Sequence, residues 1–218
     1  MTFTAKEGGS RVRMTPKALE TRARIIRGAL QSLEKHGLQA TTTRTIAEEA
    51  EVRLATLHYH FDSKDDVLLE VLDALVNELM SALKEGAGDH DTAEERIAAL
   101  MYAAWDYVAR THTKQIVQYE LTLYALRNKA LEWLARRQYE GYVEAYAAQV
   151  RGIGNPSPQL PPKEADTIAR LLLAGMDGLI LQVLSGAREA DLRAGLDALI
   201  FGAQEQVRRV RAAGDAAG

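Results

Sequence analysis

The side chains best suited to chemistry gather in one short segment, LATLHYHF, at residues 54–61. Leu57 and Phe61 stand four residues apart, which predicts one buried face of a short helix. The remaining side chains then point outward, and these are Ala55, Thr56, His58, Tyr59 and His60. Hydroxyl, imidazole and phenol groups hydrogen-bond to base edges, sugars and phosphate oxygens. The segment therefore predicts a helix that reads DNA.

Metal binding and catalysis are the alternatives for this chemistry. Residues two apart on an α-helix point about 200° away from each other, so His58 and His60 cannot hold one ion. The other histidines, at positions 36, 90 and 112, fall at expected helix ends or loops. No glycine-rich phosphate loop is present, because proline follows Gly152 and Gly154 closely. We therefore expect no metal site, no cofactor and no enzymatic activity.

The residues just before this segment predict the first helix of a helix-turn-helix. Thr43 can cap the free backbone N–H groups at the start of a helix. Ile46, Ala47 and Ala50 then form one buried stripe, and residues 51–53 make the turn into the second helix. Two short helices joined by a tight turn are therefore expected between residues 43 and 61.

Longer helices are expected on both sides of this pair. Downstream, Ser63 stands three residues before Asp66 as a cap signal, and an apolar stripe runs from Val67 to Leu83. Upstream, apolar residues recur at spacings of three and four before a stop signal at Gly37. The members of the upstream stripe are Leu19, Ala23, Ile26, Leu30 and Leu33.

This order of helices resembles the tetracycline-repressor (TetR) family of bacterial regulators over about residues 19–80. The resemblance is carried by IIRGAL at 25–30, Gly37, Thr42 and Thr43, IAEEA at 46–50, Val52, and above all TLHYHFDSKDDVL at 56–68. Glu51 departs from the family pattern, which often has glycine in the turn, and His58 stands where tyrosine is common. The resemblance implies an all-α fold, with a three-helix DNA-binding head and a C-terminal helical bundle for ligand binding and dimerisation.

The expected DNA contacts follow from these positions. Thr56 and His58 are assigned to base edges or nearby phosphates, and Tyr59 and His60 to phosphate and sugar. The complete candidate set is Thr42, Thr43, Arg44, Arg53, Ala55, Thr56, His58, Tyr59, His60 and Lys64. Because one reading helix contacts few base edges, we expect two copies on a pseudo-palindromic, double-stranded operator.

The charge distribution agrees with DNA binding at the N-terminal end. The chain carries a net charge of −3, but residues 1–64 hold 11 Lys/Arg against 7 Asp/Glu, and residues 65–218 hold 16 against 23. The basic side chains that could neutralise phosphates are Lys6, Arg11, Arg13, Lys17, Arg22, Arg24 and Arg27. A flexible basic arm is expected at residues 1–18, and a plain solvated tail at residues 1–14 remains the alternative.

The rest of the chain is predicted to be helical, without strand-like alternation. Helices are expected at about residues 92–111, 114–126, 129–150, 163–184 and 189–211, with a proline-rich loop before the last two. The expected division is an arm at 1–18, a helix-turn-helix domain at 19–66, an effector-binding and dimerisation domain at 67–211, and a disordered tail at 212–218.

Nine of the thirteen aromatic residues lie between positions 100 and 150, which predicts a small-molecule pocket with aromatic walls. The candidate lining residues are Met101, Trp105, Tyr119, Tyr124, Trp133 and Met176, with Glu120 and Arg127 as polar anchors. The alternative is that these aromatics are ordinary core packing and surface tyrosines, and that Glu120 and Arg127 form salt bridges.

The last two expected helices have more apolar surface than one chain needs, which predicts a homodimer. The expected interface residues are Leu172, Met176, Ile180, Leu184, Leu192, Leu196, Leu199 and Ala203. The resemblance implies a four-helix bundle between two subunits. The alternative is that the first of these helices is buried wholly within one chain.

Composition places the protein in the cytoplasm, without a membrane partner. No segment reaches the roughly 18 unbroken apolar residues of a membrane span, the first ten residues lack a signal-peptide core, and cysteine is absent. These observations predict a homodimeric repressor that a small-molecule effector releases from its operator. A ligand-independent or corepressor-dependent regulator and an all-α enzyme or carrier remain as alternatives.

Overall fold

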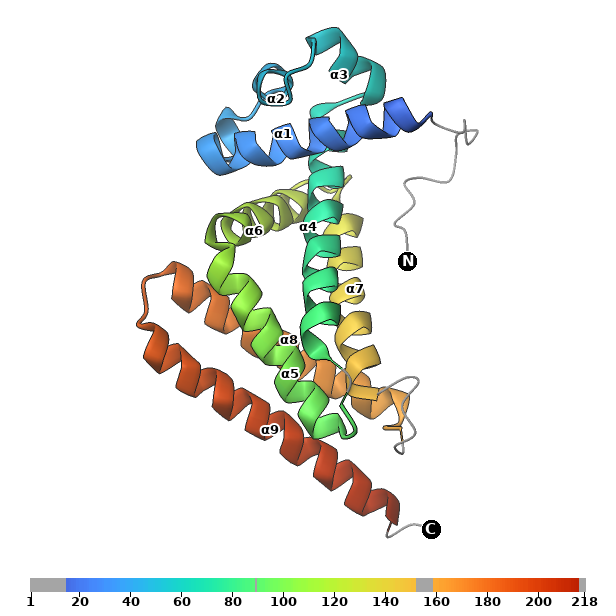
Figure 1. Cartoon of the computed structure of the whole chain (residues 1–218), viewed down its shortest axis with the longest axis vertical. Helices are drawn as coiled ribbons and strands as arrows, with labels where there is room; N and C mark the ends of the chain where they lie inside the picture. The colour runs from blue at the N-terminus through green and yellow to red at the C-terminus, as the bar shows by residue number, and fades with distance from the viewer. Residues whose placement is uncertain (1–14, 89, 152–158, 216–218) are drawn as a thin grey trace.

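The computed structural model describes residues 15–88, 90–151 and 159–215, and within these ranges the chain forms nine helices and no strand. The helices are α1 (Pro16–Ala40), α2 (Thr43–Glu49), α3 (Leu54–His60), α4 (Lys64–Ala87), α5 (Ala93–Arg110), α6 (His112–Arg127), α7 (Glu132–Arg151), α8 (Pro162–Leu184) and α9 (Glu189–Asp215). Figure 1 shows an elongated molecule, with α1, α2 and α3 at one end and the last turns of α9 at the other. The predicted all-α fold is confirmed.

The ends of the chain differ from the expected domain boundaries. Thr15 caps α1, so residues 16–18 belong to a helix rather than to a flexible arm, and residues 1–14 lie outside the described ranges. At the other end, α9 continues to Asp215 and takes in most of the predicted tail. The predicted boundary at residue 66 falls inside the first turn of α4. The glycine and proline loop at residues 152–158 also lies outside the described ranges.

The start of α2 corrects one sequence expectation. Thr42, and not Thr43, is the N-cap, because Thr42 has the extended backbone that a cap requires (φ −125°, ψ 164°). Its hydroxyl oxygen accepts the Thr45 N–H, and the Thr45 hydroxyl oxygen accepts the Thr42 N–H in return. This reciprocal capping box fixes where α2 begins.

The buried face of α1 also differs from the predicted stripe. Ile25, Ala29 and Leu33 are buried, whereas Leu19 and Ala23 are exposed and Ile26 and Leu30 are half-buried. The cause is the close packing of α1 against the end of α2, since a Cβ atom on Gly28 would lie 2.5 Å from the Ala50 nitrogen. Only glycine permits this approach, so the face of α1 that carries Gly28 is the one that packs against the end of α2.

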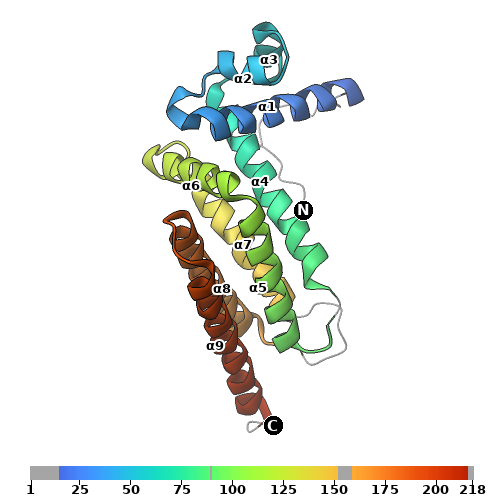
Figure 2. The same ribbon diagram turned by 60° about the vertical axis from the view of Figure 1, so that its left-hand side comes forward.

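Two hydrophobic cores follow one another along the molecule. The head core joins buried residues of α1 to α4, among them Leu57 and Phe61, to residues of α6 and α7, among them Leu121 and Leu134. The body core is formed mainly by α5, α7, α8 and α9. Figure 2 shows α6 lying across the molecule beneath the head, where it separates α1 from the body. Because α4 contributes to both cores, it links the head to the body.

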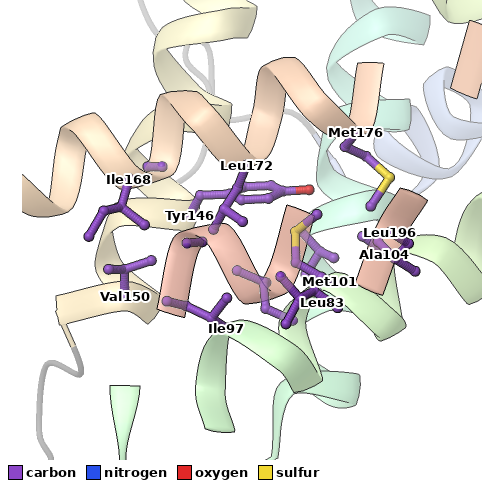
Figure 3. Close-up of a cluster of buried hydrophobic side chains, with 14 of the residues drawn as sticks. Leu83, Ile97, Met101, Ala104, Tyr146, Val150, Ile168, Leu172, Met176 and Leu196 are labelled. Atoms are coloured by element: carbon purple, nitrogen blue, oxygen red, sulfur yellow. The ribbon is translucent and has the colours of Figure 1, made fainter. Parts of the chain in front are cut away.

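The body core contains large and polarisable side chains. Tyr146 is fully enclosed, and Figure 3 shows its ring beside Leu172 with the hydroxyl oxygen on the Met176 side. Met101 and Trp105 of α5 belong to the same core. A core of this composition packs by side-chain adjustment more readily than a purely branched aliphatic one.

Among the described residues, one helix, α8, is long and apolar enough in composition to cross a membrane. Of the stretch that meets this test, 39% is buried within the chain, where α8 packs against α7 and α9. A core helix meets the same test of length and composition, so this finding by itself is weak evidence for a membrane span.

Candidate DNA-binding surface and effector site

Helix α3 is anchored by buried apolar residues and exposes polar side chains on its outer face. Leu57 and Phe61 are buried in the head core, as the four-residue spacing predicts. Tyr59 is 84% exposed, and its ring meets the His60 ring edge-on with 5.2 Å between centroids. Ala55 and His58 are also exposed, and Thr56 and His60 are half-buried. The predicted orientation of α3 is therefore confirmed, and its outer face can make hydrogen bonds and ring contacts.

Arg22 of α1 holds the end of α3, a role that the sequence did not indicate. Its Nη1 donates to the His60 carbonyl oxygen at 2.7 Å, and its Nη2 forms an ion pair with Glu70 Oε1 at 2.7 Å. Its guanidinium carbon lies 4.1 Å from the centroid of the Phe61 ring. Arg22 was expected to neutralise phosphate, but these contacts direct it inward. The partners are 38 and 48 residues away, so no local spacing reveals them.

The other predicted DNA contacts divide into exposed and engaged side chains. Thr42, Arg44 and Arg53 are exposed on and beside α2, and Thr43 is half-buried. Lys64 differs, because its Nζ donates to the Leu38 carbonyl oxygen at 3.1 Å, and burial lowers its pKa. Lys64 therefore ties the start of α4 to the end of α1. The turn between α2 and α3 holds Glu51 in the left-handed region, with φ of 51°.

The residues predicted to line one effector pocket do not converge. Met101, Trp105 and Met176 are buried in the body core, and Tyr119 packs against that core. Tyr124 instead packs against the head core and donates to Asp65 Oδ1 at 2.8 Å. The remaining three candidates are half-buried or exposed elsewhere: Glu120 faces Gly37 of α1, Trp133 is 47% exposed, and Arg127 is exposed. The spacing of apolar residues along α6 and α7 does not show which of the two cores a given residue contacts, because both helices contribute to both cores.

A cleft of about 190 Å³ lies where the start of α6 and the end of α5 meet the α8–α9 turn. Trp105 is the one predicted pocket residue that lines it. The other lining residues are Val108, Ala109, His112, Val183, Ala187, Glu189 and Leu192. The cleft has apolar walls and two titratable side chains, His112 and Glu189, so it can accept a small molecule.

Side chains of α6, α7 and α8 form a second polar cluster, which the sequence did not predict. Asp177 accepts hydrogen bonds from the hydroxyls of Tyr119 and Tyr139, each at 3.1 Å. Burial raises the pKa of Asp177, and the two phenol hydrogen bonds oppose this shift. Burial, with the Asp177 charge, also raises the pKa of Tyr139 to about 12. The phenols therefore stay protonated and act as donors to the carboxylate.

The residues predicted for a dimer interface lie mostly within the core of their own chain. Leu172, Met176, Ile180, Leu192, Leu196 and Ala203 are buried, and Leu184 and Leu199 are half-buried. The large apolar side chains that α8 and α9 leave exposed are Leu171, Leu181 and Phe201. Because α8 is apolar on nearly every face, periodicity alone could not tell which stripe faces outward.

The helical head, the exposed reading helix and the all-α body together define a helix-turn-helix DNA-binding regulator. A family model described as bacterial regulatory proteins of the tetR family matches residues 25–71, and one described as the tetracyclin repressor-like C-terminal domain matches residues 91–206. The chain belongs to the TetR family, as the sequence predicted. Members of this family are regulatory DNA-binding proteins rather than enzymes.

Individual relatives agree with this assignment over most of the chain. The HTH-type nicotine-responsive transcriptional repressor HdnoR of Paenarthrobacter nicotinovorans is 25% identical, with 82% of this chain and 93% of the relative covered. The multidrug binding protein EbrR complexed with imidazole has 27% identity and a TM-score of 0.63, with 88% and 95% covered. EbrR complexed with ethidium has 27% identity and a TM-score of 0.63, with 82% and 96% covered.

Proposed function

We propose that this protein is a homodimeric transcriptional repressor that binds a pseudo-palindromic operator through α3 and is released from it by a small molecule. The observation that carries the proposal is the outer face of α3, whose Tyr59 is 84% exposed while Leu57 and Phe61 anchor the helix. Arg22 fixes the end of the same helix. A rigid helix with exposed hydrogen-bonding groups suits base readout in the major groove.

Two subunits are needed because one short helix gives little discrimination. Each good bidentate base contact contributes about 1–3 kcal/mol, and half-sites of a dimer lie about one helical turn apart or a multiple of it. The exposed face of α8 and α9, with Leu171, Leu181 and Phe201, is the surface that we assign to the partner. Covering these side chains removes apolar area from water and stabilises the dimer.

Ligand release follows from linkage between the body and the head. A molecule that binds better when the two heads are wrongly spaced must lower operator affinity by the same factor. Helix α4 belongs to both cores, and Figure 1 shows it leading from the head into the body. A tilt of α4 would change the separation of the heads. HdnoR is described as nicotine-responsive, and EbrR has been solved with ethidium, which supports a small-molecule effector here.

The DNA contact is tested with the double variant His58→Ala/Tyr59→Ala. Duplexes selected from a random library supply the operator, and fluorescence anisotropy gives the affinity. Both side chains are exposed, so the variant should fold normally and lose at least about tenfold in operator affinity. Glu140→Ala, at an exposed position of α7, is the control. Equal affinity of the double variant and the wild type would contradict the assignment of α3 as the reading helix.

The dimer is tested by placing a charge on the face assigned to the partner. Phe201→Glu should shift the protein toward monomer in analytical ultracentrifugation, because an unpaired carboxylate in an apolar interface is costly. Trp133→Glu is the matched control, since Trp133 is also a large exposed aromatic residue but lies on α7. A wild-type monomer, or a Phe201→Glu variant that dimerises as well as wild type, would exclude this interface.

A further inference from the structure

One carboxylate lies among four tyrosines where α6, α7 and α8 meet. The Asp177 cluster consists of Asp177, Tyr119, Tyr139, Tyr142 and Tyr146. Tyr119 donates to Oδ1 and Tyr139 donates to Oδ2, each at 3.1 Å. The Tyr142 ring meets the Tyr139 ring edge-on, with 6.0 Å between centroids. Tyr146 is fully enclosed, and the Asp177 charge, added to burial, raises its pKa.

No cation among the described residues is paired with the carboxylate of Asp177. In the described parts of the chain, neither lysine nor arginine forms an ion pair with it, and no cation contributes to its pKa. Asp177 is half-buried, and a carboxylate partly removed from water is stabilised by a positive partner or by further hydrogen bonds. Two phenol donors leave acceptor capacity on both oxygens. The Asp177 cluster therefore holds a negative charge that no lysine or arginine of the described ranges neutralises.

The side chains around the Asp177 cluster indicate which class of cation would bind there. The faces of tyrosine rings attract cations, and this attraction grows when water is excluded. On α6, Ile116 and Leu123 lie three residues before and four residues after Tyr119, and Leu123 is 55% exposed. A half-buried carboxylate beside the half-buried phenol rings of Tyr119 and Tyr139, with an exposed apolar rim of Ile116 and Leu123, suits a cation that also carries apolar groups, unlike a hydrated metal ion.

We propose that the Asp177 cluster binds an organic cation, with the positive charge beside Asp177 and the apolar groups against the half-buried rings of Tyr119 and Tyr139 and the apolar rim. The regulatory consequence rests on the proposed function, because it identifies this cation with the effector that releases the operator. The cluster joins α6, which also packs in the head core, to α8, which carries Leu181 of the proposed dimer face. A bound cation would draw these two helices together.

The first experiment compares a cation with an uncharged molecule of the same shape. Benzyltrimethylammonium and 2,2-dimethyl-1-phenylpropane differ in one central atom, nitrogen against carbon, and therefore in charge. Each is titrated into the full-length protein while tryptophan fluorescence is recorded. The cation should bind at least about tenfold more tightly than the neutral isostere, as charge pairing in a partly buried site requires. Equal affinities would overturn the proposal.

The second experiment assigns that preference to one residue. Asp177→Asn keeps the size of the side chain and should weaken benzyltrimethylammonium binding at least about tenfold while leaving the neutral isostere unchanged. Asp166→Asn, on an exposed position of the same helix, is the matched control and should change neither affinity. Thermal unfolding confirms that both variants are folded. If Asp177→Asn binds the cation as wild type does but dimerises less well, the carboxylate belongs to the subunit interface and the proposal is overturned.

Operator affinity, measured in the same samples, separates this inference from the proposed function. Cation binding that depends on Asp177 but leaves operator affinity unchanged supports the cation site and contradicts release of the operator by its ligand. Operator binding by a protein that cannot distinguish the cation from its neutral isostere contradicts the cation site alone. A cation that binds through Asp177 and lowers operator affinity supports both.

Discussion

The hydrophobic cores of the head and the body differ in composition and in how closely they pack. The head core is mostly aliphatic, with Gly28 in direct contact with Ala50, and its buried hydroxyls are paired, as Ser32 is with Thr41. The body core includes Met101 and Met176 and is bordered by the Asp177 cluster and a cleft of about 190 Å³. Close packing of small groups holds one geometry, whereas methionines and incompletely neutralised polar groups leave room for adjustment. The head thus has the more fixed packing and the body the more adjustable one.

The largest expected effect concerns the part of the head core that the body supplies. Leu121→Ala on α6 should lower the free energy of unfolding by about 2–5 kcal/mol, because Leu121 is buried. Hydrogen exchange should show faster opening of α1 to α4 as well as of α6. Leu123→Ala, two residues away and exposed, is the control and should cost under about 0.5 kcal/mol. Faster exchange confined to the body would mean that the two cores are independent.

The tight packing of the head is tested at Gly28. Gly28→Ala should lower the free energy of unfolding by about 1–3 kcal/mol, because the new methyl group meets backbone atoms of α2 that cannot move away alone. Thermal unfolding measures the loss. Arg27→Ala, at the neighbouring exposed position, should stay within about 0.5 kcal/mol of wild type. A Gly28→Ala variant as stable as the control would show that α1 and α2 can separate without cost.

The turn between α2 and α3 offers a smaller effect in the opposite direction. Glu51 adopts a φ of 51°, a conformation that strains residues with a Cβ atom, so Glu51→Gly should raise the free energy of unfolding by up to about 1 kcal/mol. Glu48→Gly, inside α2, should lower it by about 1 kcal/mol. Urea unfolding distinguishes the two. A loss of stability in Glu51→Gly would mean that the glutamate side chain compensates for the strain.

The smallest expected effect concerns pH and the body. Burial raises the pKa of Asp177 in the folded protein, so the folded state binds the proton more tightly than the unfolded state. Its ionised form therefore lowers stability at neutral pH, and this penalty is lost as pH falls through the raised pKa. Asp177→Asn should raise the melting temperature at pH 7 by up to about 2 °C and by less at about pH 4. A difference that is the same at both pH values, or that Asp166→Asn reproduces, would contradict this expectation.

The sequence predicted the head in more detail than the body for a physical reason. In the head, caps, turns and four-residue spacings are local, and they correctly predicted α3, its buried Leu57 and Phe61, and the start of α4 after Ser63. The error at Thr43 lay between two adjacent threonines, of which Thr42 forms the capping box with Thr45. The error in the stripe of α1 arose where a contact with another helix, at Gly28 and Ala50, decides which face is buried. The helix expected at about residues 92–111 agrees with α5, Ala93–Arg110, so a strongly amphipathic body helix is equally predictable.

The candidate sites of the body were less predictable, because they depend on which helix meets which. Tyr119 and Asp177 are 58 residues apart, so no local spacing in the sequence predicts their hydrogen bond. Tyr119 and Tyr124 lie on one helix but contact different cores, so the residues predicted to line one pocket lie in two separate places. On α8, apolar residues occupy nearly all faces, and the predicted partner contacts proved to be the buried stripe. An apolar composition predicts burial without indicating the neighbour.

The contribution of α6 and α7 to the head core limits how such regulators can be recombined. Val117, Leu121 and Ala125 complete the packing around α1 and α4, so a chimera joined after α4 would combine the DNA-reading helices of one parent with mismatched supports from another. Grafting the α6 face together with residues 15–88 would preserve those contacts. In this chain, a transferable reading module is discontinuous in sequence.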